Sequence, residues 1–299
     1  MKTSFSLSNN IFFSPELRTR LGRIILFIAI GSFLLHLTLY TFYTYLLGME
    51  PAGLLSSPIN AIYTPFSFLL IYEAYLLLYY LQHSTTIYVG KQYEIIVLIL
   101  IRGIFKDMTH LDLNQNNFLS ANNIEFWYDL GAVIILFILI LLFYRISGKK
   151  SMGVDGSEGL ANANVQLQKF IISKRILATI LFLITLGIGI YSFSNWLLGL
   201  RSGEMLVSTP NLNAIFFDHF FTLLILSDVL ILLFSLFYTD EFPIIIRNSS
   251  FVISTILLKL SFGAESGISQ LFIVAGVGFG VGISAITRWY TRRQSGTVV

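Results

Sequence analysis

The stretch GAVIILFILILLFY, residues 131–144, decides the fold because it runs for 14 residues without a charged side chain. It belongs to a hydrophobic run over residues 124–146, and an α-helix needs about 20 such residues to cross ~30 Å of hydrocarbon. The sequence predicts eight spans of this kind, at 24–47, 59–82, 90–108, 124–146, 174–199, 213–238, 246–263 and 268–288. We therefore expect an all-α polytopic membrane protein with eight transmembrane helices.

The amino-acid composition is typical of an integral membrane protein. Of the 299 residues, 55% are hydrophobic and 12% are charged, whereas soluble domains carry roughly 25% charged residues. The absence of cysteine excludes disulfides, thiolate metal sites and a cysteine nucleophile. The net charge of +3 is small and is spread along the flanks of the spans, which argues against nucleic acid as a partner. The expected surroundings are the lipid bilayer.

The basic residues predict how the chain is oriented. With eight spans, 15 of the 19 lysines and arginines fall on one side of the membrane and two on the other. Basic loops stay in the cytoplasm. The prediction is a multi-pass protein of the cell (plasma or inner) membrane with both termini cytoplasmic.

The two halves of the chain share a pattern. The first span ends in YLLG at residues 45–48 and the fifth in WLLG at residues 196–199, and one acid follows at matched depth in each half, Glu73 or Asp228. Four spans per unit would give parallel repeats. The predicted boundaries are an N-terminal cytoplasmic segment (1–23), a first four-helix unit (24–147), a cytoplasmic linker (148–172), a second unit (173–290) and a cytoplasmic tail (291–299).

Four charged residues are predicted to lie near the middle of the membrane, namely Glu73, Arg102, Asp228 and Lys259. A charge at that depth costs at least ~2.5–3.5 kcal/mol, so each needs a partner. The simplest pairing joins Glu73 to Arg102 and Asp228 to Lys259. Such pairs either lock helices together or line an ion or proton pathway, and both interpretations stay open.

Two further features are candidates for a role. His36 lies inside the first span and is a weaker candidate for a proton relay, since a lone histidine is more often a hydrogen-bonded interior residue. The eighth span carries a row of glycines in two overlapping GxxxG patterns that favour close helix packing, either between the halves or in a homo-oligomer. These glycines are Gly276, Gly278, Gly280 and Gly282.

No stretch of the sequence matches a catalytic motif. Paired carboxylates on one face, HExxH, GxSxG and a phosphate-cradling loop are all missing. We therefore predict a protein that is not an enzyme and that uses no catalytic residue, metal or cofactor. Its protein partners are not indicated.

Four stretches of the first half carry a family resemblance. They are FLLIYE (68–73), YYLQ (79–82), LILIRGIFKD (98–107) and RISGKK (145–150). Over residues 24–150 the chain resembles the phosphate-starvation-inducible E (PsiE-like) family, with Glu73 and Arg102 at the positions of that family's buried acid and arginine. The resemblance implies a four-span inner-membrane unit associated with stress, and the second half would be a diverged copy. The function expected is a structural or regulatory membrane protein, and the alternative is a small-ion or proton channel or transporter.

Overall fold

The computed structural model describes residues 13–46, 48, 58–108, 123–148, 165–202, 212–238, 242–265 and 267–296. Within these ranges the chain is helical, with eight α-helices and no strand. The helices are α1 (Pro15–Thr41), α2 (Tyr63–Leu81), α3 (Thr85–Met108), α4 (Ile124–Ser147), α5 (Val165–Ser202), α6 (Leu212–Tyr238), α7 (Phe242–Ser261) and α8 (Ile268–Gly296). A π-helical turn over Phe42–Leu46 extends α1, and a 3-10 turn over Pro58–Ile62 precedes α2.

Local sequence explains where several helices begin and end. Ser14 caps the start of α1, where its Oγ accepts a hydrogen bond of 3.1 Å from the Leu17 amide, and Pro15 occupies the first turn. Gly148 ends α4 with φ of 83°, a conformation that glycine adopts without strain. Helix α5 begins at Val165, so the last residues of the segment predicted as a linker are helical, and residues 149–164 lie outside the described part.

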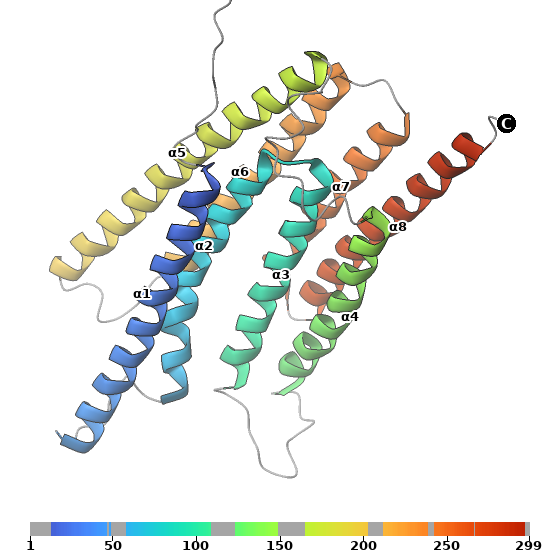
Figure 1. Ribbon diagram of the computed structural model, residues 1–299. Coiled ribbons are helices and arrows are strands. Elements are labelled where there is room, and N and C mark those ends of the chain that lie inside the picture. Colours follow the sequence, from blue (N-terminus) through green and yellow to red (C-terminus); the bar gives the residue numbers. More distant parts are fainter. Residues whose placement is uncertain are drawn as a thin grey trace, which may run out of the picture.

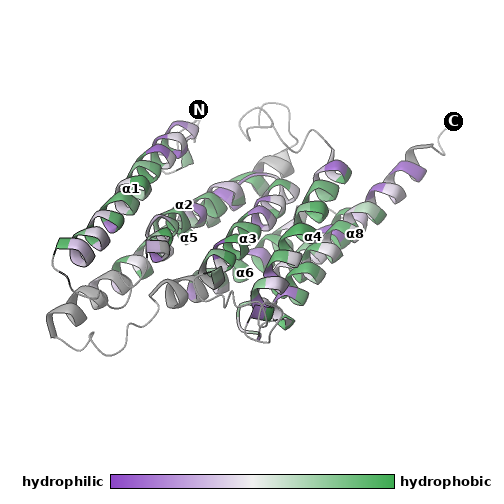
Figure 2. Ribbon diagram, turned by 90° about the horizontal axis from the view of Figure 1, so that it is seen from below, coloured by the Kyte–Doolittle hydropathy of each residue, from purple (hydrophilic) through white to green (hydrophobic). Residues whose placement is uncertain are grey.

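Seven of the eight helices are long and apolar enough to cross a membrane, which makes the chain a multi-pass membrane protein. Large apolar side chains point outward, as on Phe27, Leu141 and Phe237, where lipid would surround them. Figure 2 shows that the hydrophilic residues gather at the start of α1 and the end of α8, while apolar residues cover most of the helical lengths.

Helix α3 is not apolar enough to count as a membrane span. Seven of the eight predicted spans are therefore supported by the structure. Helix α3 carries Lys91, Glu94 and Arg102 along its 24 residues. The helix lies between α2 and α4 in Figure 1, and Tyr88 and Tyr93 are almost fully buried on its inner face. Much of the polar surface of α3 therefore packs against neighbouring helices rather than lipid.

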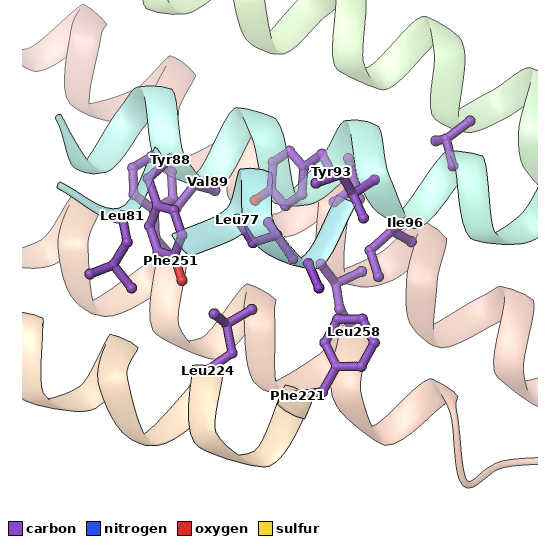
Figure 3. Close-up of a cluster of buried hydrophobic side chains, with 14 of the residues drawn as sticks. Leu77, Leu81, Tyr88, Val89, Tyr93, Ile96, Phe221, Leu224, Phe251 and Leu258 are labelled. Carbon is purple, nitrogen blue, oxygen red and sulfur yellow. The ribbon is translucent and has the colours of Figure 1, made fainter. Parts of the chain in front are cut away.

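Helices that follow one another in sequence pack side by side, from α1 to α4 and again from α5 to α8. The two sets meet where α3 contacts α7, α4 contacts α8 and α2 contacts α5. Figure 3 shows this junction, with Leu77 of α2 and Ile96 of α3 facing Leu224 of α6 and Leu258 of α7. The first and second halves thus share one hydrophobic core.

The glycines of α8 allow close approach inside the chain. A Cβ on Gly276 would lie 3.1 Å from the Ser254 carbonyl oxygen of α7, and a Cβ on Gly280 would overlap the Tyr93 hydroxyl of α3. Tyr93 Oη lies 2.7 Å from Ser254 Oγ, which donates a 2.7 Å hydrogen bond to the Gly276 carbonyl. This α3–α7–α8 junction therefore occupies the Gly276 and Gly280 face. Gly278 looks toward α4, and Gly282 has open space around it.

Candidate functional site

The predicted contact between Glu73 and Arg102 is present in the structure. Arg102 Nη2 of α3 donates a 3.1 Å hydrogen bond to Glu73 Oε2 of α2, and both side chains are about one-eighth exposed. Arg102 Nη1 also donates to the Phe66 carbonyl at 3.3 Å. The guanidinium thus binds α2 at two points that are seven residues, or about 10 Å, apart along the helix. This arrangement satisfies both charges and fixes α2 against α3.

Asp228 of α6 is surrounded differently from the prediction. Its Oδ2 accepts a 3.2 Å hydrogen bond from Gln92 Nε2 of α3, and both residues are buried. The positive charge that acts on it belongs to Lys174 of α5. The predicted partner, Lys259, shares with Asp228 the wall of a small cavity. The predicted Asp228–Lys259 pair is therefore replaced by a contact that joins the two halves.

The start of α7 explains this difference. The prediction counted depth from Ser249, but α7 begins at Phe242. Lys259 is 17 residues beyond Phe242, which is about 25 Å along the axis, whereas Asp228 is 10 residues before the end of α6, about 15 Å. The residue of α7 that lines both cavities beside Asp228 is Thr255, one turn earlier. Counting from Ser249 left out about two turns at the start of α7, so the prediction placed Lys259 about 10 Å too shallow.

Lys174 is 2% exposed, although the sequence placed it at the membrane surface. Its ammonium donates a hydrogen bond to the His83 carbonyl in the turn between α2 and α3, and it interacts with Asp228 through space. A buried ammonium needs such partners because desolvation penalises its charge. Lys174 thereby attaches α5 to the first half of the chain.

Two water-sized cavities lie on either side of Asp228. One has a volume of about 10 Å³ and is lined by Tyr88, Asn248 and Thr255, while the other has about 20 Å³ and is lined by Gln92 and Lys259. A cavity of ~10–15 Å³ is enough for one water molecule. In the described part of the chain Gln92 Oε1 is buried without a hydrogen-bond partner, and the Tyr88 hydroxyl interacts with Asp228 and Gln92, so polar groups border both cavities.

His36 of α1 faces α2. Its Nδ1 is 3.0 Å from Thr64 Oγ1, and the hydroxyl of Thr64 also lies 2.9 Å from the Ala61 carbonyl. The side chain is 8% exposed. These contacts fit an interior histidine that joins two helices, and its role as a relay stays a prediction. In the described part of the chain, no three histidine or acidic residues gather as metal ligands.

Sequence reasoning missed Tyr88, Gln92, Lys174 and Thr255. A signal existed on α7, where Asn248, Ser254 and Thr255 are buried while Ile253 and Ile256 are exposed. Polar residues that recur at helical spacing within an apolar span indicate the face that meets other helices. The same pattern on α3 and α7 would have predicted that the polar faces of these two helices contact other helices.

No family model, no curated protein and no solved structure matches the chain.

Proposed function

We propose that the chain is a non-enzymatic membrane protein, structural or regulatory, whose buried polar contacts hold two four-helix units in one fixed arrangement. The observation that carries this proposal is the set of contacts made by α3. Arg102 binds Glu73 of α2, Gln92 binds Asp228 of α6, and Tyr93 contacts Ser254 of α7. One helix thus connects three others by polar groups at two levels, Gln92 and Tyr93 near its start and Arg102 nearer its end.

This proposal includes α3 as an eighth membrane-embedded helix. Its 24 residues span about 36 Å, enough to cross the hydrocarbon core. The consecutive packing order is the same in both halves, which supports the parallel repeat. Figure 1 shows the start of α1 and the end of α8 at the same end of the bundle. Arg18 and Lys91 contact Tyr80 near the end of α2. Arg288 contacts Arg145 near the end of α4. Under the positive-inside rule this end faces the cytoplasm, and the PsiE-like resemblance of the first half stays part of the proposal.

A second function is favoured by the cavities beside Asp228. A carboxylate with water-sized space on both sides, next to the Tyr88 hydroxyl that interacts with it, resembles a step in a proton path. Cavities of this size suit water and protons, whereas a hydrated metal cation needs more room. The Glu73–Arg102 pair is mutually satisfied and fits the locking role.

One experiment distinguishes the two functions. Proton flux is measured in proteoliposomes with a trapped pH dye, using wild type, Asp228→Asn and Glu73→Gln, and the thermal stability of each protein is measured in detergent. Asp129→Asn is the matched control, because that carboxylate is also buried but binds Gln270 of α8.

The structural proposal expects flux no higher than in empty liposomes and a clearly lower melting temperature for Glu73→Gln. Flux that disappears in well-folded Asp228→Asn but persists in Asp129→Asn would establish the proton path instead. Unchanged stability together with absent flux would contradict both functions.

A further inference from the structure

A cavity of about 310 Å³ opens at the end of the bundle where α4 and α8 end and where α3 and α7 begin. It is separate from the Asp228 cavities and plays no part in the function proposed above. Its volume lies at the lower limit of ordinary ligand sites, ~300–1,000 Å³. At ~30 Å³ per water molecule it would hold about ten waters, so it has room for a substantial polar group.

Hydrogen-bond donors dominate the wall of this cavity. Arg247 of α7 and Arg288 of α8 both line it, together with several hydroxyl side chains, and the described lining residues include no carboxylate. Arg288 Nη1 donates to the Arg145 and Ile146 carbonyls at the end of α4. This anchor holds one guanidinium in place through Nη1, and the other N–H groups have no hydrogen-bond partner among the described residues, which leaves them to a ligand.

Two buried donors among the residues of this wall have no hydrogen-bond partner within the part of the chain that the structure describes. They are Arg247 Nε and the Ser147 hydroxyl. A buried polar atom without a hydrogen bond costs about 1–3 kcal/mol, and an arginine in particular presents a planar fork of donors that matches phosphate oxygens. The two atoms lie on different helices, α7 and α4, and the residues that carry them both line the same cavity.

The helix ends add to the attraction for an anion. Thr86 lies in the first turn of α3 and Ile244 in the first turn of α7, and both line the cavity. Backbone N–H groups in the first turn lack partners within the helix, and the dipole gives that end a partial positive charge. Two helix starts and two arginines therefore surround the same space.

We infer that this cavity binds an anion that carries a phosphate group, with Arg247, Arg288 and Ser147 as its ligands. The cavity opens between membrane helices near their ends, where the headgroup of an anionic lipid would lie, and a soluble phosphate ester would present the same oxygens. Both sources share one chemistry, and binding would hold α4, α7 and α8 together.

The test measures the melting temperature of the purified full chain in neutral detergent. One arm adds phosphatidylglycerol against phosphatidylcholine, and the other adds inorganic phosphate or glycerol 3-phosphate against chloride at equal ionic strength. The variants are Arg247→Gln and Ser147→Ala. The matched control is Arg145→Gln, which removes the same charge from an exposed side chain at the same end and leaves the backbone carbonyl that binds Arg288.

Wild type and Arg145→Gln should be stabilised by one of the phosphate-bearing probes. Arg247→Gln should need about tenfold more of that probe for the same response, since a hydrogen bond to a charged group is lost. Ser147→Ala carries no charge change and provides the answer if Arg247→Gln does not fold. A response to phosphatidylglycerol alone identifies a lipid headgroup, and a response to the soluble probes identifies a free phosphate ester.

Two results with wild type and the arginine variants would overturn the inference. One is the lack of any response in wild type, and the other is an equal loss of response in Arg145→Gln and Arg247→Gln, which would indicate surface charge alone. Asp240 and Glu241 precede α7 and lie outside the described residues, so D240N/E241Q is included. This double variant should keep the response, and its loss would also count against an anion held by Arg247.

Discussion

Replacing Gly280 with alanine should disrupt the α3–α7–α8 junction. The added Cβ would overlap the Tyr93 hydroxyl oxygen and lie 3.1 Å from Tyr93 Cζ. Tyr93 is fully buried, its ring packs edge-on against Phe143 with centroids 5.2 Å apart, and its hydroxyl lies 2.7 Å from Ser254 Oγ. The ring therefore cannot move aside without losing the hydrogen bond or the packing.

The expected magnitude follows from these contacts. Overpacking costs about 1–3 kcal/mol, and a buried hydroxyl left without its partner costs a further 1–3 kcal/mol or so. The better helix propensity of alanine returns at most about 1 kcal/mol. We expect Gly280→Ala to lower the free energy of unfolding by about 1–5 kcal/mol.

This loss would be measured by heating the protein in detergent and determining the fraction that remains folded by size-exclusion chromatography. Gly282→Ala is the matched control, because nothing lies within 4 Å of the added Cβ, and its stability should be unchanged or slightly higher. Tyr93→Phe removes the oxygen that the Cβ would overlap, so the double variant with Gly280→Ala should lose less than the two single losses combined. Equal stability of Gly280→Ala and Gly282→Ala, or strict additivity with Tyr93→Phe, would refute the reasoning.

Two other predictions concern the buried polar contacts. Glu73→Gln and Arg102→Met should each destabilise the protein by about 3–5 kcal/mol, because each leaves one buried charge unpaired. The double variant should be closer to wild type in stability. Melting temperatures in a double-mutant cycle check this, and additive losses would show that the contact does not hold α2 against α3. Ser254→Ala should cost about 1–3 kcal/mol, since it removes the partner of Tyr93. Ser250→Ala, whose hydroxyl binds only the Ile246 carbonyl of its own helix, should cost less in the same assay, and the reverse order would contradict this account.

Hydrophobic run length was sufficient to locate the helices. The predicted span at 124–146 is α4 at Ile124–Ser147, and the predicted span at 213–238 is α6 at Leu212–Tyr238. The third span was predicted from residue 90, although α3 begins at Thr85. Run length marks the apolar part of a helix, while the polar ends depend on capping and on neighbouring helices, which hydropathy does not report.

Pairing between helices was harder to predict. Glu73 and Arg102 could be matched because both lie in adjacent helices of one half and no other charge competes there. Asp228 was paired with Lys259 of its own half, whereas its partners depend on which residues of α3 and α5 face α6. That orientation is set by packing between halves, which a single sequence records only weakly in the buried polar residues of each helix.

The contacts of α3 also constrain how the protein can be made. In the proposed arrangement, in which α3 is an eighth membrane helix, Arg102 meets Glu73 as soon as α2 and α3 are inserted. Gln92 and Tyr93 receive their partners from α6 and α7, which the ribosome synthesises more than 100 residues later. During that interval the proposed membrane helix α3 carries polar groups whose partners, among the described residues, lie in the second half. Biogenesis of the first half is therefore completed after translation of the second, and a chain interrupted at the linker would leave an early helix exposed to quality control.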